Sequence, residues 1–579
     1  MAVIVALERP LVAGERRGWY GGGVKTDFMS RFGPLLFAAG GTVLVLWQML
    51  LPGYVLTWDM TFGPAHVFPK VSGLVNGFPV WFLIYAVGFV MPMWAVQKAI
   101  LVGLFFSLFY LPLRFFPFNT ESWTRYAAAS LYAVNPFVYE RFLAGQWTIL
   151  AAYALLAPFF YYLLELLRAP ERRTALYLAA TMLLIGVFSL HAFVMAALIA
   201  AAVVIVGLVR YPAGARPLAG CAALTGVIVA MVSLYWIVPY LMNPEAAPVP
   251  HFTEAHWSAF QTSADPVVFG NATGNVAMLY GFWGESYPWM QSLRSPKDTL
   301  TVFLPSLLAL TIVIVVGGVA LARKRSERFR ALLLLAIGAA AFVFSVGLAP
   351  SVFFGFNLWL FEHVPFWRGF RDTEKWSMVL ALIYAYFFAA GASYLVSAVR
   401  PKLRYVAQIA LVVLPLVYTF TMLGGFAGQL RAVEYPAPWY EVNAFLEKDA
   451  ECKALFLPCH QYYWLAFNDS RLTGNTAPRF FDCTIVSSAD AEIGEVGDQG
   501  ASPSYRAIAD AVTNNNLQSV DDTLAVLRKE GIRYVIYTAD VQRYDEYTYP
   551  FLDQTGLTKM YEYPVGNPVD NLHIVLIRL

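Results

Sequence analysis

The chain has 579 residues, of which 59% are hydrophobic and only 13% are charged. A soluble domain usually carries about 25% charged residues, so this composition excludes an ordinary soluble protein and indicates a membrane protein. The net charge of +2 hides two parts of opposite sign, because residues 431–579 hold 21 acidic and 12 basic residues and the rest holds 17 acidic and 28 basic ones. The near-neutral total gives no sign of a nucleic-acid partner.

Eleven apolar segments are candidates for membrane-spanning helices, which need about 20 mostly apolar residues. Nine are clear, at residues 33–51, 147–167, 174–190, 192–209, 218–238, 299–322, 331–348, 376–397 and 405–424, and two are weaker, at 98–113 and 125–139. Residues 1–32 include five basic residues, which predicts a cytoplasmic segment before a signal anchor rather than a cleaved signal peptide.

Basic clusters between the spans predict the topology. They lie at residues 168–173, 210–216, 323–330 and 400–404, with two spans between each successive pair, and the positive-inside rule places all four in the cytoplasm. If segment 77–96 also crossed, the basic N-terminus would lie opposite the cluster at 168–173. We therefore expect 77–96 to lie along the outer interface. The N-terminus is then cytoplasmic, and loops 52–97, 243–298 and 350–375 face outward.

The acidic C-terminal part, residues 426–579, reads as an extracytoplasmic α/β domain. Helical patterns at 440–449, 504–512 and 521–531 alternate with strand patterns at 452–458, 532–540, 559–565 and 572–579. The segment has no glycine-rich phosphate loop and no nucleophile motif, so we expect an accessory domain that covers or shapes the outer mouth of the membrane part. Cys452, Cys459 and Cys483 allow one disulfide with one thiol left over.

Asp59 follows the end of the first span by a few residues, at the level of the lipid headgroups. An acid at this level can act as a general base on an acceptor hydroxyl or as a ligand for a divalent cation. The alternative is a helix cap or a solvated loop acid.

A second candidate is the segment before residue 376, where Arg368, Arg371 and Lys375 alternate with aromatic residues. A basic cluster on the outer side is unusual for simple anchoring, and arginine and lysine suit a lipid phosphate or diphosphate. The alternatives are interfacial snorkelling and local neutralisation by Asp372 and Glu374.

Ionisable residues at span ends form the third group. Glu140 and Arg141 lie near the outer end of a span, where charge is costly and indicates function, unless the two pair with each other. In loop 243–298, His256, Trp257 and Glu285 combine acids and aromatics that suit sugar contacts as well as an ordinary interfacial loop. We expect His191, between two spans, to be structural.

Together these features resemble the GT-C superfamily, polytopic membrane glycosyltransferases that use polyprenyl-linked sugar donors. The resemblance rests on Asp59 in a long first outer loop, the interfacial segment before the second span, and the short second outer turn that follows Asn135 and Pro136 and ends at Trp147. Residues 371–375 resemble the R-x-P-x-K-F pattern of arabinofuranosyltransferase and YfhO-like bacterial and archaeal members. Three departures are an altered motif, with Thr373 in place of proline and Trp376 in place of phenylalanine, a single acid in the first loop, and Gln146 in the second turn.

The resemblance implies a GT-C-like membrane domain at 33–425 of about eleven spans, in a multi-pass protein of the plasma membrane and cell envelope. It implies transfer of a sugar from a polyprenyl-phosphate-linked donor to a lipid, glycan or protein acceptor on the outer face. Asp59 is then the catalytic base, and Arg368, Arg371 and Lys375 hold the donor phosphate. Substrate contacts are expected from residues of the second turn and loop 243–298: Glu140, Arg141, Gln146, His256, Trp257 and Glu285.

Gln146 stands where metal-dependent members often have an acid, so we expect no required cofactor, with a divalent cation as the alternative. Two other functions stay open. A transporter or lipid flippase would place ionisable residues in mid-span and repeat its halves, and a non-catalytic scaffold would bind a partner through the outer domain.

Overall fold

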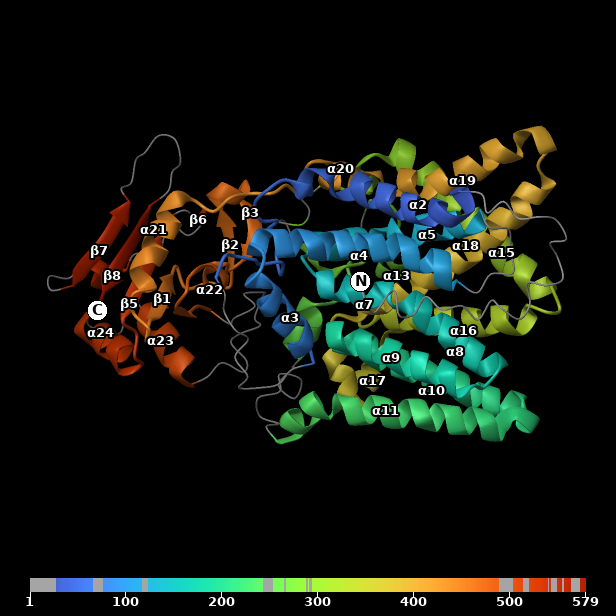
Figure 1. Cartoon of the computed structure of the whole chain (residues 1–579), viewed down its shortest axis with the longest axis horizontal. Coiled ribbons are helices and arrows are strands. Elements are labelled where there is room, and N and C mark those ends of the chain that lie inside the picture. Colours follow the sequence, from blue (N-terminus) through green and yellow to red (C-terminus); the bar gives the residue numbers. More distant parts are fainter. Residues whose placement is uncertain are drawn as a thin grey trace.

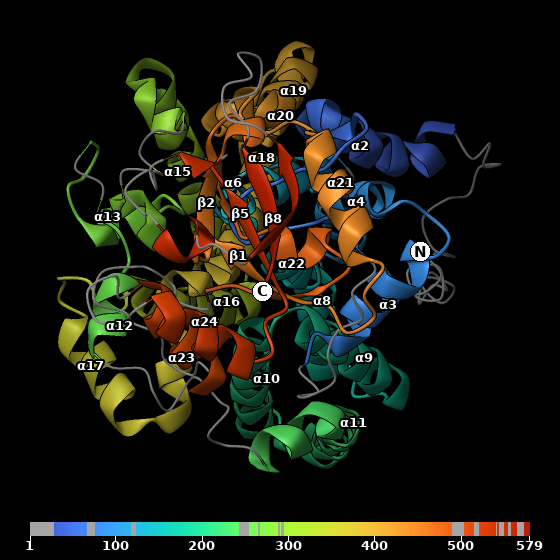
Figure 2. The same ribbon diagram turned by 90° about the vertical axis from the view of Figure 1, so that its left-hand side faces the viewer.

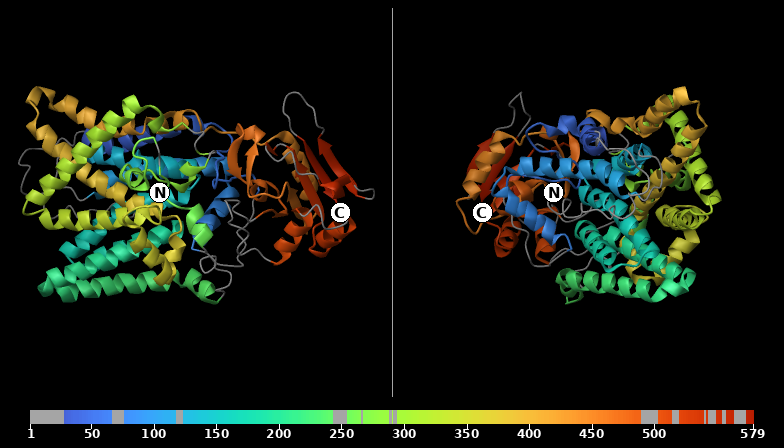
Figure 3. Two further views of the ribbon diagram at one scale, coloured as in Figure 1. Left: turned by 180° about the vertical axis from the view of Figure 1, so that it is seen from behind. Right: turned by 45° about the vertical axis from the view of Figure 1, so that its right-hand side comes forward.

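The computed structural model describes residues 28–65, 76–116, 123–242, 254–264, 267–287, 290, 294–488, 503–513, 520–539, 541–542, 549–553, 557–563 and 573–579. Most of the predicted N-terminal segment 1–32 lies outside these residues. Two parts are evident in Figure 1, a bundle of long helices and a sheet domain at one end of it. Seen from behind, the sheet domain again extends beyond the end of the bundle (Figure 3).

Nine helical segments in the described part of the chain are long and apolar enough to cross a membrane. They comprise α2 (Phe28–Leu46) with η1 (Trp47–Leu50), α4 (Met93–Phe115), α7 (Trp147–Ala154) with α8 (Leu156–Arg168), α10 (Leu190–Arg210), η2 (Pro212–Gly214) with α11 (Ala215–Met242), α15 (Leu300–Arg323), α16 (Arg328–Val346), η8 (Thr373–Trp376) with α18 (Ser377–Ala398), and η9 (Pro401–Leu403) with α19 (Arg404–Tyr418).

The remaining two of the eleven predicted spans form shorter helices. Segment 174–190 is α9 (Arg172–Phe188), with 17 residues. Segment 125–139 is broken into α5 (Thr124–Ala133) and α6 (Pro136–Leu143). The break occurs at Asn135, whose side chain caps α6 by accepting from the amide of Val138 at 3.1 Å, because Pro136 disfavours helical geometry in the residue before it.

The helix α3 (Phe78–Gly88) has only 11 residues. It is therefore about 16 Å long, roughly half of the ~30 Å hydrocarbon core. A helix of this length cannot cross alone, in agreement with the expectation that segment 77–96 does not span.

The helices of the bundle differ in how much of their surface is buried. The helices α4, α8 and α18 are largely buried, whereas α11 and α19 expose most of their residues. α15 and α18 approach closely where a Cβ on Gly317 would lie 1.9 Å from the carbonyl oxygen of Phe387 and one on Gly391 would lie 1.9 Å from that of Val313. Paired glycines allow this approach, as in other membrane helix pairs.

The C-terminal domain is an α/β domain, as predicted. Its five-stranded sheet has the order β4-β1-β5-β8-β7 and comprises β1 (Lys453–Leu457), β4 (Thr484–Val486), β5 (Tyr534–Thr538), β7 (Thr558–Tyr563) and β8 (Ile574–Arg578). β1 is parallel to β4 and β5, and the other pairs are antiparallel. The helices α21 (Ala437–Leu446), α23 (Pro503–Thr513) and α24 (Val520–Lys529) flank the sheet (Figure 2).

A second, three-stranded antiparallel sheet faces the bundle and was not predicted. Its order is β3-β2-β6, with β2 (Tyr462–Leu465), β3 (Arg471–Gly474) and β6 (Val541–Gln542). In the same domain Cys452 and Cys483 form a disulfide, and Cys459 is the thiol left over. The domain thus has one disulfide bridging the elements that lead into β1 and β4.

Candidate active site

The loop that carries Asp59, residues 51–65, is held by the bundle on one side. The side chain of Gln97 in α4 accepts from the amide of Val55 at 2.9 Å and donates to its carbonyl at 2.7 Å. The Thr57 hydroxyl donates to the carbonyl of Leu143 at 2.6 Å, and the Asp59 amide donates to that of Ala144 at 3.3 Å. Residues 53–60 are buried with one exception, Asp59, whose side chain is exposed.

The carboxylate of Asp59 accepts two hydrogen bonds from opposite parts of the chain. The Tyr462 hydroxyl donates to Oδ1 at 2.8 Å, and the Gln146 side-chain amide donates to Oδ2 at 3.3 Å. Although Asp59 is exposed, the surrounding protein displaces enough water that desolvation raises the pKa of its carboxyl, against the two hydrogen bonds and the charges of Lys375 and Arg141. A raised pKa suits a general base because the carboxylate holds an abstracted proton more readily.

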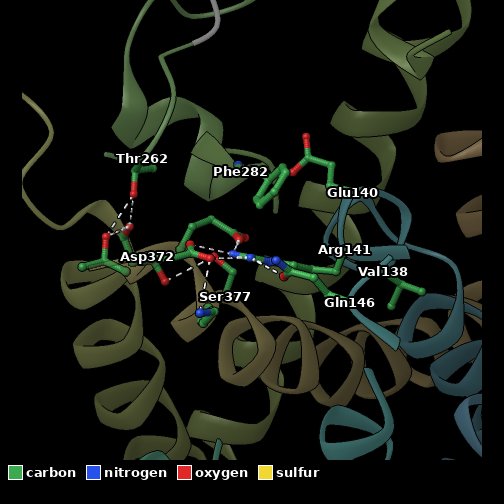
Figure 4. Close-up of polar contacts among 12 residues, drawn as sticks. Val138, Glu140, Arg141, Gln146, Thr262, Phe282, Asp372 and Ser377 are labelled. Atoms are coloured by element: carbon green, nitrogen blue, oxygen red, sulfur yellow. Dashed lines mark hydrogen bonds and ion pairs between the residues drawn. The ribbon is translucent and has the colours of Figure 1, made fainter. Parts of the chain in front are cut away.

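Behind Gln146 lies a fully buried arginine, Arg141, from the short helix α6 (Figure 4). Its guanidinium donates to both carboxylate oxygens of Asp372, at 2.6 and 2.9 Å, to the carboxylate of Glu374, and to Oε1 of Gln146 at 2.8 Å. Burial alone would raise the pKa of Asp372, but the charges of Arg141 and Lys375 outweigh it and hold the pKa well below its usual range.

The alternative in which Glu140 pairs with Arg141 is therefore wrong. Helical geometry directs adjacent residues to different faces, so Arg141 binds acids of the 372–374 segment instead. The alternative in which Asp372 and Glu374 neutralise the basic cluster locally is only partly right. Asp372 lies 3.5 Å from the ammonium of Lys375, but both acids bind Arg141, which is remote in sequence.

The three basic residues of the predicted phosphate cluster have different surroundings. Lys375 is buried beside Asp372. Arg371 is half-buried, with its guanidinium 4.2 Å from the ring centroid of Phe260, and burial lowers its pKa, which Asp372, Tyr462 and Asp59 partly restore. Arg368 donates to the carbonyl of Phe361 at 3.2 Å. Lys375 and Arg371 thus lie next to Asp372, which Arg141 and Gln146 link to Asp59 by hydrogen bonds.

A chain of aromatic rings connects the Asp59 loop to these arginines. The ring centroid of Trp58 lies 5.8 Å from the centroids of Phe282 and Trp283. The centroid of Trp283 lies 4.7 Å from that of Phe260. The Arg141 guanidinium is 4.6 Å from the Phe282 ring, and that of Arg371 stacks on Phe260. These rings come from the first loop and from loop 254–287, so segments far apart in sequence meet at one place.

Glu140 belongs to a second buried cluster beside Phe282. One of its oxygens accepts from the Phe282 amide at 3.4 Å. Burial, and then the neighbouring Glu285, raise the pKa of Glu140 well above its usual value. Glu285 in turn accepts from Lys297 at 2.7 Å and from Asn275 at 2.9 Å. These contacts join loop 254–298 to α6.

The remaining predicted residues lie at the edge of this arrangement. His256 is buried, and burial together with the charge of Arg371 lowers its pKa. Trp257 packs on Phe361 with ring centroids 5.1 Å apart. The His191 ring nitrogen lies 2.9 Å from the carbonyl oxygen of Gly369, so it supports the segment that carries Arg371.

The structure thus brings Asp59, Arg141, Gln146, Arg371 and Lys375 into one cluster and leaves Arg368 and Trp257 at its margin. Sequence reasoning missed Tyr462, Trp58, Phe260 and Phe282. Tyr462 lies 403 positions from Asp59, and nothing in its local sequence distinguishes it from the other tyrosines. Within the described ranges, no group of three or more His, Cys, Asp or Glu side chains could hold a metal ion.

Comparisons with known proteins identify the fold. No family model matches the chain, and no curated protein matches it significantly. Among solved structures, the arabinofuranosyltransferase AftD from Mycobacteria aligns over 95% of this chain and 40% of its own, with a TM-score of 0.61 and 14% identity. A mutant of AftD aligns over 95% and 41%, with a TM-score of 0.59 and 15% identity. The chain spans about two fifths of the length of these structures. The chain therefore shares the fold of these AftD structures, in agreement with the membrane-glycosyltransferase fold that the sequence resemblance implies.

Proposed function

We propose that the chain is a glycosyltransferase that moves a sugar from a polyprenyl-phosphate-linked donor to an acceptor on the outer face of the membrane. Asp59 is the general base in this proposal. The observation that carries it is the convergence of Asp59 with Arg371 and Lys375 at one end of the bundle. It is supported by hydrogen bonds that run from Asp59 through Gln146 and Arg141 to Asp372. Arg371 directly precedes Asp372 and Lys375 lies 3.5 Å from it, and both cations suit a phosphate leaving group.

The proposed reaction is a single displacement at the anomeric carbon. The acceptor hydroxyl loses its proton to Asp59 while its oxygen bonds to the anomeric carbon. The bond from that carbon to the phosphate oxygen breaks, and the polyprenyl phosphate leaves with the electron pair. Arg371 and Lys375 stabilise the charge that develops on the phosphate, with Arg368 at the margin.

Residues that do not touch the substrate hold this arrangement in place. Arg141 is fully buried and its contacts are to protein groups, so we assign it a positioning role. Its bond to Gln146 fixes the amide that donates to Asp59, and its ion pair with Asp372 fixes the residue next to Arg371. The partners of Asp59 are an amide and a phenol, which favours direct base catalysis over metal binding at this position. A divalent cation remains the alternative.

The outer location of the site is supported by three features. The site lies on the side of the bundle that meets the C-terminal domain, where Tyr462 contacts it. That domain contains the Cys452–Cys483 disulfide, a bond typical of compartments outside the cytosol. The eleven spans expected from the sequence, an odd number, would put the two ends of the bundle's chain on opposite sides of the membrane.

The test is transfer by purified protein in lipid nanodiscs, with radiolabelled polyprenyl-phosphate arabinofuranose as first donor because the structural neighbours are named arabinofuranosyltransferases. Oligosaccharide and lipid acceptors are offered in parallel. Asp59→Asn should reduce the transfer rate by about 10²–10⁴-fold, the usual contribution of a general base.

Asp469→Asn is the matched control. Asp469 is an exposed acid with positive φ, a conformation that asparagine also adopts, and its carboxylate forms an ion pair with the exposed Arg431. The control should transfer at the wild-type rate. Full activity of Asp59→Asn, or movement of the labelled lipid across the membrane without release of its sugar, would overturn the proposal.

A further inference from the structure

The C-terminal domain contributes a side chain to Asp59, namely Tyr462 at the start of β2. Its hydroxyl donates to Oδ1 of Asp59 at 2.8 Å, which is the shorter of the two side-chain hydrogen bonds on this carboxylate. The domain therefore reaches the proposed base itself as well as the loop around it.

Backbone hydrogen bonds fix the position of Tyr462 relative to Asp59. β2 pairs with β3 so that Tyr462 is opposite Gly474. The Gly474 amide donates to the carbonyl of Trp58 at 2.8 Å, and the Trp58 amide donates to the carbonyl of Leu472 at 3.1 Å. Trp58 thus extends the three-stranded sheet by one residue, directly before Asp59.

Other contacts hold the same loop against the domain. Asn468 donates to the carbonyl of Leu56 at 3.2 Å, and the Tyr435 hydroxyl donates to that of Phe62 at 2.7 Å. The amide of Ala65 donates to the carbonyl of Arg479 at 3.1 Å. The loop is therefore held between the domain and the bundle. The distance from Tyr462 to Asp59 is set by backbone hydrogen bonds between the loop and the domain, and not by the rotamers of the two side chains alone.

Two donors on opposite oxygens leave room for a substrate. An ionised carboxylate offers about four lone-pair sites, of which Tyr462 and Gln146 use two, so two remain for an acceptor hydroxyl. Both donors stabilise the ionised form, as do the charged groups around Asp59, which are Lys375 and Arg141 from the bundle and Arg371 from the 368–375 segment.

We propose that Tyr462 is a positioning residue for Asp59, so that the C-terminal domain completes the active site. The proposal rests on the proposed function of Asp59 as base. The phenol holds the carboxylate in one orientation and keeps it ionised until the acceptor hydroxyl arrives.

The first test compares Tyr462→Phe with Tyr463→Phe in the transfer assay with polyprenyl-phosphate arabinofuranose. Tyr463 is the next residue of β2 and is buried, and its hydroxyl bonds to the carbonyl of Pro458 instead of to Asp59. Tyr462→Phe should lower kcat about 10-fold, as expected for a lost hydrogen bond to a charged group, with little change in KM for the donor.

The pH dependence of kcat distinguishes a role of Tyr462 in positioning Asp59 from a role in the stability of the domain alone. Loss of a donor to the ionised carboxylate raises its pKa, so the acid limb of kcat should move to higher pH in Tyr462→Phe. Tyr463→Phe removes a hydroxyl from the same strand, so any loss of stability it causes should leave the acid limb at its wild-type pH.

A second measurement does not depend on transfer. N,N′-dicyclohexylcarbodiimide adds to carboxyl groups in their protonated form, and peptide mass spectrometry gives the pH at which half of Asp59 is modified. This pH should rise in Tyr462→Phe and stay unchanged in Tyr463→Phe. If Asp59→Asn transfers normally, the proposed function fails while the labelling still reports on the Tyr462 hydrogen bond. Wild-type kcat, pH profile and labelling in Tyr462→Phe would overturn this inference alone.

Discussion

Arg141 is buried with no exposed surface, and it binds two carboxylates that lie 231 and 233 positions further along the chain. A buried guanidinium is costly unless its donors are paired, and the planar fork of arginine suits the two oxygens of Asp372. The same guanidinium orients Gln146, which donates to Asp59. One residue thus couples the stability of the bundle to the geometry of the proposed base.

Replacing Arg141 should destabilise the protein strongly. Arg141→Met keeps much of the side-chain volume but leaves Asp372 and Glu374 buried without their shared cation, and removal of one partner from a buried pair typically costs about 3–5 kcal/mol. The measurement is the thermal unfolding midpoint in detergent at neutral pH. Arg368→Met is the control because Arg368 is half-buried and donates to a backbone carbonyl. Equal midpoints for the two variants would contradict the assigned role.

The sequence predicts some residues of the candidate site better than others. Asp59, Arg371 and Lys375 were found because their charge is unusual at a span end, and this signal is local. The partners of Arg141 and Asp59 have no such signal. Asp372 and Glu374 look like neutralising neighbours of Lys375, and Tyr462 is one of 33 tyrosines in the chain. Which side chains come into contact depends on tertiary packing, and tertiary packing cannot be predicted from the local pattern of a single sequence.

The turn between α6 and α7 is the element that presses against the Asp59 loop. Gly145 lies there with φ +72°, and a Cβ on it would be 2.3 Å from the Met60 amide nitrogen and 2.4 Å from the Thr57 carbonyl oxygen. A glycine is required at this position because both the backbone conformation and the close approach exclude a side chain. The turn and the loop therefore behave as one unit.

Gly145→Ala should displace the Asp59 loop and reduce transfer. The added methyl group clashes with backbone atoms of residues 57–60, so the loop must shift and the two hydrogen bonds on Asp59 weaken. We expect a fall in kcat of about 10²-fold, as found when reacting groups are misplaced by about an ångström. Gly103→Ala is the control because that glycine lies in α4 with open space around its Cβ position, and alanine there favours the helix. Similar rates for both variants would contradict the role of the turn.

Elements with a strong apolar pattern were predicted well. Nine predicted spans match long helices, and the strands at 452–458, 532–540 and 572–579 match β1, β5 and β8. The short second sheet was missed because β2, β3 and β6 contain two to four residues each and carry no clear alternation. It is this sheet that contacts the Asp59 loop, so the sequence could not predict how the domain joins the site.

At the scale of the whole molecule, the topology connects the fold to the proposed reaction. The candidate site and the C-terminal domain with its disulfide lie at one end of the helix bundle. The basic loops 323–330 and 400–404 lie at the opposite end. The positive-inside rule places those loops in the cytoplasm. In this predicted orientation Asp59 and Tyr462 would lie on the outer face, and the proposed donor and acceptor would meet there.

Cysteine labelling in intact cells tests this orientation. Ser326 lies in an exposed basic loop and Thr558 is exposed on β7, so Ser326→Cys and Thr558→Cys place one thiol at each end of the molecule. A membrane-impermeant maleimide should label Thr558→Cys before lysis and Ser326→Cys only after it. The unsubstituted protein is the control, because Cys221 and Cys459, the two cysteines outside the disulfide, are both buried. Labelling of Ser326→Cys alone in intact cells would reverse the orientation and move the active site to the cytoplasmic face. The donor would then have to carry its sugar on that side, so this result would change the proposed substrate as well as the topology.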